Sequence, residues 1–245
     1  MPIVADDLKP FSAASVPEDD VSTSGGAIDL ESSPDLTQLG GNSVIAIISD
    51  GADTRTATIT GRLPTGAVDT EAPVLNGTTE VVGSKTFERF LKLVLSATDG
   101  SRTVTVKEGS GGATRATIGP NETTRHLFFQ KSASESSAVT RYEKKFFKNT
   151  HGSITLTEAK VELTADPVSK IEIGVAASKD DSGSVTNRKT APGGITFVDD
   201  NVAQDVPNQE LVAGEAIGVW IKQSLGAGDT AQKTTFTTEL AGNTT

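Results

Sequence analysis

The stretch from Tyr142 to Val175 constrains the fold more than any other part of the chain. It holds three runs in which apolar and polar residues alternate, and turn residues such as Asn149 and Pro167 separate them. Alternation places every second side chain on one face, which is typical of a half-buried β-strand. We therefore predict three strands in this stretch.

The middle run changes face part-way along. Its apolar residues up to Leu156 carry even numbers, and those from Ala159 to Leu163 carry odd numbers. Successive side chains of a regular strand point to opposite faces, so this switch requires one extra residue. The pattern predicts a β-bulge near Thr157-Glu158.

Similar short apolar runs, separated by Gly, Pro, Asn and Asp, fill the rest of the chain after residue 42. We predict that Ser43–Ser49 is a buried strand and that Thr56–Thr60 pairs back onto it as a hairpin. Phe87–Ala97 also fits helical spacing, but its β-rich surroundings favour a strand. The predicted fold class is all-β.

We expect two β-sandwich or jelly-roll-like domains, at residues 43–132 and 138–242, with the polar stretch Lys131–Ser137 between them. Residues 1–42 have isolated apolar residues among Pro, Gly, Ser and Asp, so this segment cannot bury enough surface to fold alone. We expect an extended N-terminal arm that lies on a neighbouring subunit. The alternative is that it packs along its own β domain. The apolar residues expected at the contact are Ile3, Val4, Leu8 and Phe11.

Charge is unevenly distributed. The net charge is -10, and residues 1–40 hold eight carboxylates against one lysine. Such an acidic balance argues against nucleic acid as a direct partner, because phosphate contacts need clustered cations. The one concentrated basic cluster consists of Arg141, Lys144, Lys145 and Lys148. Three interpretations are open for it: a contact with an acidic arm of a neighbouring subunit, a nucleic-acid contact, and an ordinary solvated strand face.

The sequence offers little for catalysis. It has no Cys, and its two histidines, His126 and His151, lack a partner at metal-ligand spacing. Neither glycine-rich segment has the ending of a phosphate-binding loop, and no nucleophile-elbow motif is present. We expect no enzyme activity, catalytic residue, cofactor or metal. No apolar run approaches the ~18 residues of a membrane span, so we expect no membrane partner.

Several segments resemble poorly characterised structural proteins of tailed bacteriophages. In the run from Lys145 to Val161, an aromatic–basic–Asn-Thr sequence precedes an apolar strand that ends in Ala-Lys-Val. The blocks Leu211–Ile221 and Val74–Thr79, the latter leading into Thr86–Arg89, resemble the same proteins. The resemblance is patchy over residues 75–245 and does not include the N-terminal segment.

The resemblance implies a virion component assembled in the host cytoplasm. We expect a capsid decoration or cement protein that is a homo-oligomer and contacts other virion proteins, above all the major capsid protein. The alternatives are a tail, neck or baseplate protein and a surface carbohydrate-binding or adhesion module. The last would need an exposed aromatic platform, for which Trp220 and Tyr142 are the candidates.

Overall fold

The computed structural model describes residues 2–128, 135–230 and 234–244. The fold is all-β within this part of the chain, apart from two one-turn 3-10 helices, η1 (Ala5–Asp7) and η2 (Pro207–Gln209). The chain divides into two compact units. Unit 1 comprises Met1–Asp29 and Lys131–Thr245, and unit 2 comprises Leu30–Gln130. Along the sequence, unit 2 is therefore inserted between two parts of unit 1.

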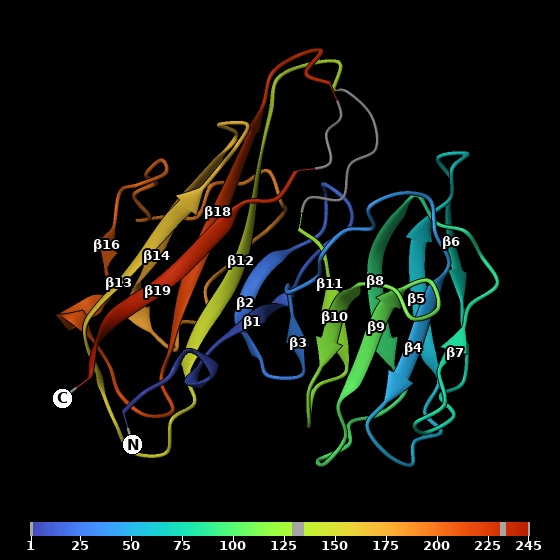
Figure 1. The fold of residues 1–245 in the computed structure, drawn as a ribbon. Coiled ribbons are helices and arrows are strands. Elements are labelled where there is room, and N and C mark those ends of the chain that lie inside the picture. The colour runs from blue at the N-terminus through green and yellow to red at the C-terminus, as the bar shows by residue number, and fades with distance from the viewer. Residues whose placement is uncertain (1, 129–134, 231–233, 245) are drawn as a thin grey trace. The chain divides into compact units, whose positions relative to one another are not determined.

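Unit 2 contains two sheets (Figure 1). The four-stranded sheet has the order β10-β9-β4-β7 and consists of β4 (Ile45–Ser49), β7 (Val81–Val82), β9 (Val104–Glu108) and β10 (Thr114–Ile118). The five-stranded sheet has the order β3-β11-β8-β5-β6 and consists of β3 (Ser32–Ser33), β5 (Ala57–Arg62), β6 (Val68–Glu71), β8 (Arg89–Leu95) and β11 (Thr124–His126). Strands β3 and β11 are parallel, and the other pairs of unit 2 are antiparallel.

One hydrophobic cluster joins the two sheets of unit 2. Ile45 and Ile47 on β4 and Ile59 on β5 are fully buried in it, together with Phe87 and Phe90. Burying large apolar side chains contributes roughly 1.5–3 kcal/mol each, so this cluster is the main source of stability of unit 2. A Cβ at Gly61 would lie 2.3 Å from the Phe87 ring, which explains the glycine inside β5.

Unit 1 is built on a six-stranded sheet with the order β14-β18-β12-β1-β2-β15. Its strands are β1 (Leu8–Ser15), β2 (Ser24–Asp29), β12 (Val139–Asn149), β14 (Ile171–Lys179), β15 (Ser184–Val185) and β18 (Ala216–Leu225). A second sheet consists of β13 (Leu156–Ala165), β16 (Gln204–Asp205), β17 (Glu210–Leu211) and β19 (Thr237–Thr244). In it, β19 pairs with β13 (Figure 1).

The bulge predicted in the middle strand is confirmed. The register of β13 against β19 shifts between Thr157 and Lys160, and Glu158 has a φ of 51°. This left-handed conformation is unfavourable for a residue with a Cβ. It supplies the extra residue that brings Leu156 and Ala159 to the same buried face.

The expected N-terminal arm is wrong as a separate segment. Strand β1 pairs with β12 on one side and with β2 on the other, so the N-terminal residues are part of the sheet of unit 1. This pairing satisfies the backbone of β1, and it buries Phe11 and Ala13 against Phe146. The alternative interpretation, packing on its own domain, describes the structure. The expected boundary at residue 42 is replaced by one at Asp29–Leu30.

Two local predictions had different outcomes. Phe87–Ala97 contains strand β8 rather than a helix, as predicted. The hairpin of Ser43–Ser49 with Thr56–Thr60 is wrong, because β4 pairs with β7 and β9, whereas β5 pairs with β6 and β8. The two segments lie in different sheets, and the Asp50–Asp53 turn carries the chain from one sheet to the other.

Candidate functional site: a buried ionic cluster in unit 1

Strand β12 carries the predicted basic cluster, but it is not a solvated strand face. It lies inside the sheet, between β18 and β1, and its Arg141, Lys144 and Lys145 are 1 %, 0 % and 7 % exposed. A buried cation is stable only when it has compensating partners. Most of the partners are found in segments of unit 1 that are distant in the sequence.

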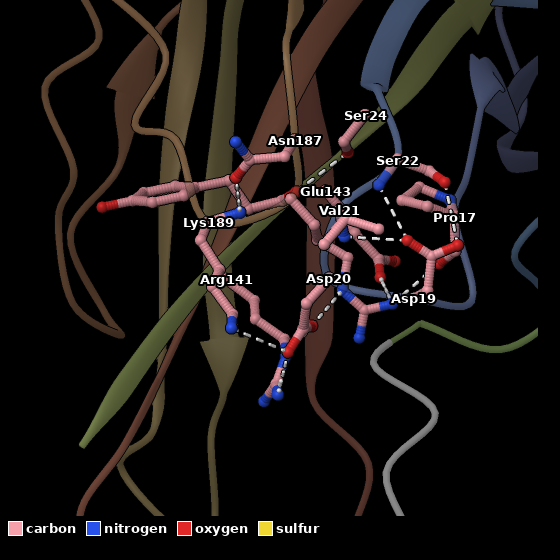
Figure 2. Close-up of polar contacts among 12 residues, drawn as sticks. Pro17, Asp19, Asp20, Val21, Ser22, Ser24, Arg141, Glu143, Asn187 and Lys189 are labelled. Atoms are coloured by element: carbon pink, nitrogen blue, oxygen red, sulfur yellow. Dashed lines mark hydrogen bonds and ion pairs between the residues drawn. The ribbon is translucent and has the colours of Figure 1, made fainter. Parts of the chain in front are cut away.

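Arg141 is held by two carboxylates. Its Nε and Nη2 donate to the two oxygens of Asp20, at 2.5 and 2.8 Å, and Nη2 also donates to Glu135 Oε1 at 2.7 Å. This two-pronged contact is the strongest geometry available to a guanidinium and a carboxylate. It ties the loop between β1 and β2 to β12 (Figure 2).

Arg188 is the second buried guanidinium, from the loop that follows β15. Its Nη1 donates to the carbonyl of Pro17 at 2.7 Å and lies 3.3 Å from Glu143 Oε1. Its Nε lies 3.6 Å from Asp20 Oδ1, and Lys189 Nζ is 3.3 Å from Asp20 Oδ2. We call this set the ionic cluster, and its members are Asp20, Glu135, Arg141, Glu143, Arg188 and Lys189. It contains as many cations as carboxylates.

The cluster fixes the charge of Asp20. The hydrogen bond from Arg141 holds the pKa of the Asp20 carboxyl well below its ordinary value, against the opposing effect of burial. Next to it, Asp19 shapes the loop by accepting the backbone N–H groups of Val21 and Ser22 at 2.8 and 2.7 Å (Figure 2). Asp20 is therefore presented to Arg141 as a fixed anion.

Lys144 has a cage of its own on the opposite face of β12. Its ammonium lies 2.5 Å from Asp181 Oδ2 and donates to the carbonyls of Gly26, Asp181 and Gly183, at 3.1–3.3 Å. Burial lowers the pKa of Lys144, and the bond to Asp181 opposes this effect. A Cβ at Gly25 would lie 2.6 Å from the Trp220 ring, so only glycine lets β2 approach this closely.

The other two predicted cations are also bound within the chain. Lys145 Nζ contacts Thr238 Oγ1 on β19 and lies 4.1 Å from the centre of the Phe147 ring. Lys148 Nζ contacts the Gly214 carbonyl. The charge complementarity expected between the basic strand and an acidic N-terminal segment is thus present, but both partners belong to one chain.

The predicted apolar contact residues separate into two kinds. Phe11 is 6 % exposed and packs in the core, and Leu8 is half-buried at the start of β1. Ile3 is half-buried, whereas Val4 is 56 % exposed. Of this set, Val4 presents the most surface for a contact with another molecule.

Sequence reasoning missed Arg188, Glu143 and Glu135 as members of the cluster. Arg188 lies in a long polar loop, where a lone arginine resembles any solvated residue. The available signal was Arg141-Tyr-Glu143 in a strand between apolar neighbours, because charges on a strand with two covered faces need internal partners.

A groove of about 660 Å³ lies beside the outer edge of β14. It is lined by small apolar residues such as Ala176 and Val206, and by the polar side chains of Thr196, Gln204 and Asn208. Gln204 uses its amide within the fold, accepting from Val175 N at 2.8 Å and donating to Thr196 O at 3.0 Å. The groove therefore offers a binding surface, with Gln204 acting as part of its wall.

The groups considered for chemistry are dispersed. Among the described residues, no group of three or more His, Asp or Glu side chains is arranged to hold a metal ion. His126 is buried in β11, and His151 Nδ1 accepts the backbone N–H groups of Ser153 and Ile154 in a turn. Trp220 is 3 % exposed, and Tyr142 packs on Phe197. Neither aromatic residue forms the exposed platform that a carbohydrate-binding module would need.

No protein-family model, no curated protein and no solved structure matches the chain. No helix in the described ranges is long and apolar enough to cross a membrane.

Proposed function

We propose that this chain is a non-enzymatic structural component of a tailed-phage particle, and specifically a capsid decoration or cement protein. In this role it is a homo-oligomer of the virion that contacts the major capsid protein, and its two units act as β-sandwich-like building blocks. The assignment to a phage particle is motivated by the sequence resemblance over residues 75–245.

One structural observation favours a scaffold. Every cation of the predicted basic cluster is bound to another segment of the same chain, in contacts that join β12 to the N-terminal segment, β19 and two loops. Such contacts restrict motion and engage these groups within the fold. A protein that reinforces a shell needs this kind of internal rigidity.

The position of the chain in the particle tests the proposal. Antibodies raised against the purified protein would be used for immunogold electron microscopy of phage particles, with mass spectrometry of the same particles. We expect label on the shell. Label on the tail or baseplate would favour the alternative structural role, and absence of the chain from purified particles would overturn the proposal.

A surface-binding module is the second candidate, and the groove beside β14 favours it. The groove has no aromatic platform, but the Asn208 amide and the Thr196 hydroxyl suit a small polar ligand such as a sugar, and Ala176 and Val206 add apolar lining. Saturation-transfer NMR with a panel of neutral sugars tests this candidate, with Asn208→Ala as the variant expected to lose the signal.

A further inference from the structure

Strand β19 is the longest unguarded sheet edge in the part of the chain that the structure describes. It has eight residues and pairs with β13 along one side only. Seven of its residues, all except Leu240, are exposed or half-buried. An exposed edge presents a row of backbone donors and acceptors that can pair with another strand.

Among the described residues, each of the other edge strands with four or more residues carries a feature that hinders pairing, and the remaining edge strands have two residues each. On β14, the outer edge at Ile173 is bridged by Val198, and the Val175 N–H is taken by the Gln204 side chain. On β10, Thr37 N donates to the Arg115 carbonyl at 2.7 Å. Strand β6 has four residues, of which two are carboxylates. These are the usual means by which proteins prevent edge pairing.

On β19, the carbonyls of Thr237 and Asn243, near its two ends, accept from the Thr164 and Thr157 hydroxyls of the neighbouring strand β13. The sequence of β19, Thr-Thr-Glu-Leu-Ala-Gly-Asn-Thr, contains no proline and no lysine. Its single charge is Glu239, and no residue of β19, Gly242 included, has a positive φ. The register shifts in this pair leave β19 itself extended over all eight residues.

We propose that β19 pairs antiparallel with β19 of a second copy of this chain, so that the β13–β19 sheets of two molecules become continuous. This inference deepens the proposed function, on which its biological setting rests, by assigning a surface to the homo-oligomer. An edge of Thr, Ala, Gly and Asn offers no charged or aromatic feature that would select a foreign protein. Two identical edges are complementary by symmetry.

Symmetry and charge together select the register. A two-fold axis through the sheet makes residues of equal parity face each other, and centring it on Glu239 would oppose two carboxylates. Centring the axis at Ala241 places Glu239 opposite the second copy's Asn243 and Leu240 opposite its Gly242. Small side chains then lie next to the axis, where the two strands come closest.

A cysteine trap tests this pairing, since the chain has no Cys. In the proposed register, the two copies of Ala241→Cys lie about 4.5–5.5 Å apart at Cβ, close to disulfide geometry. Ala191→Cys, at an exposed position in a loop of the same unit, is the matched control. In a glutathione redox buffer, we expect Ala241→Cys to form disulfide dimers at least about tenfold faster than the control. Equal rates would overturn the proposal.

A charge-swap experiment distinguishes stable pairing from a rare encounter that a disulfide would trap. Ala241→Lys and Ala241→Glu each oppose like charges across the axis, so each alone should be monomeric by sedimentation velocity. An equimolar mixture should recover the dimer. A mixture that behaves like either variant alone counts against the register.

Both experiments use the purified full chain, with Trp220 emission confirming that each variant is folded. If the strands do not pair, the position of the chain in the particle can still be determined by the microscopy described above. Failure of the strand pairing can therefore be distinguished from failure of the proposed function.

Discussion

Units 1 and 2 are both β structures, but they bury charge in different ways. In unit 2, the buried carboxylates find partners nearby in the sequence: Asp53 pairs with Arg55, and Glu122 with Arg125. In unit 1, Asp20 and Arg141 are 121 residues apart. Unit 2 is one continuous segment around one apolar cluster, whereas unit 1 needs segments from both ends of the chain.

This difference shows what a buried ionic cluster contributes. Removing charges from water costs several kcal/mol per ion, and the cluster offsets this cost only when all partners are in place. Apolar side chains can be buried in many arrangements, whereas the ionic cluster has all its partners in only one. In unit 1, it favours the pairing in which the β1–β2 loop meets both Arg141 and Arg188.

The largest expected effect comes from deleting residues 2–29. This removes β1 and β2 from the sheet and leaves Arg141 and Arg188 without Asp20. We expect unit 1 to lose its cooperative unfolding transition, whereas unit 2 keeps slow amide exchange. Hydrogen–deuterium exchange resolved by peptide measures both. Native protection in β12 and β18 of the deleted protein would contradict the comparison.

Arg141→Ala should have the next largest effect. The substitution leaves Asp20 and Glu135 without their main cation in a largely buried site, which costs about 3–5 kcal/mol of unfolding free energy. Urea unfolding followed by Trp220 emission measures it, because the chain has one Trp and it lies in unit 1. Lys160→Ala is the control, since its pair with Asp205 is half exposed and should contribute less than about 1 kcal/mol.

The corresponding substitution in unit 2 is Phe90→Ala. Phe90 is fully buried in the apolar cluster, and truncating a buried Phe costs about 3–5 kcal/mol. Amide exchange of β5 and β8 should accelerate, and the Trp220 transition should be unchanged. A shift of that transition as large as the one from Arg141→Ala would show that the two units do not unfold separately.

Acid should act on unit 1 through Asp20, with a smaller effect. A carboxyl with a depressed folded-state pKa stabilises the fold above its unfolded pKa, near 3.8, and this contribution is lost as the pH falls through the folded pKa. Unit 1 should therefore lose stability progressively below about pH 4. Urea midpoints of the Trp220 transition between pH 6 and 3 measure the loss.

Asp20→Asn should make this pH dependence shallower, because the asparagine does not titrate. Asp53→Asn, in unit 2, is the matched control and should leave the pH dependence of the Trp220 transition unchanged. An unaltered slope for Asp20→Asn would show that other carboxylates govern the acid response of unit 1.

The smallest effect concerns the bulge. Glu158→Gly relieves a φ of 51° and removes an exposed hydrogen bond from Asn243 Nδ2 to the Glu158 carboxylate. The net effect should be a stabilisation of unit 1 by up to about 1 kcal/mol. Thr164→Gly, in the same strand without a positive φ, should destabilise it by about 0.5–1 kcal/mol. Trp220 unfolding compares the two. Destabilisation by both would show that Glu158 makes contacts worth more than its backbone strain.

Local features of this fold could be predicted from the sequence. The all-β class followed from short alternating runs, and the bulge followed from the parity change between Leu156 and Ala159. Both predictions use only neighbouring residues, because strand periodicity is a property of consecutive side chains.

Long-range pairing could not be predicted in the same way. The hairpin of Ser43–Ser49 with Thr56–Thr60 was wrong because proximity in sequence does not identify the partner of a strand. The basic strand looked exposed, since nothing in its own residues reveals that β1 and β18 flank it. The ionic cluster depends on strand pairings across more than a hundred residues. Its charged residues could be identified from the sequence, but their burial could not.

The insertion of unit 2 has a consequence for synthesis. Strands β1 and β2 leave the ribosome before unit 2, and β12 begins at Val139, more than a hundred residues later. At about 5–20 residues per second, the first strands wait roughly 6–25 s for their partner. Unit 2 can close its own core during this interval. The many carboxylates and isolated apolar residues of the N-terminal segment would then keep a waiting strand soluble until β12 arrives.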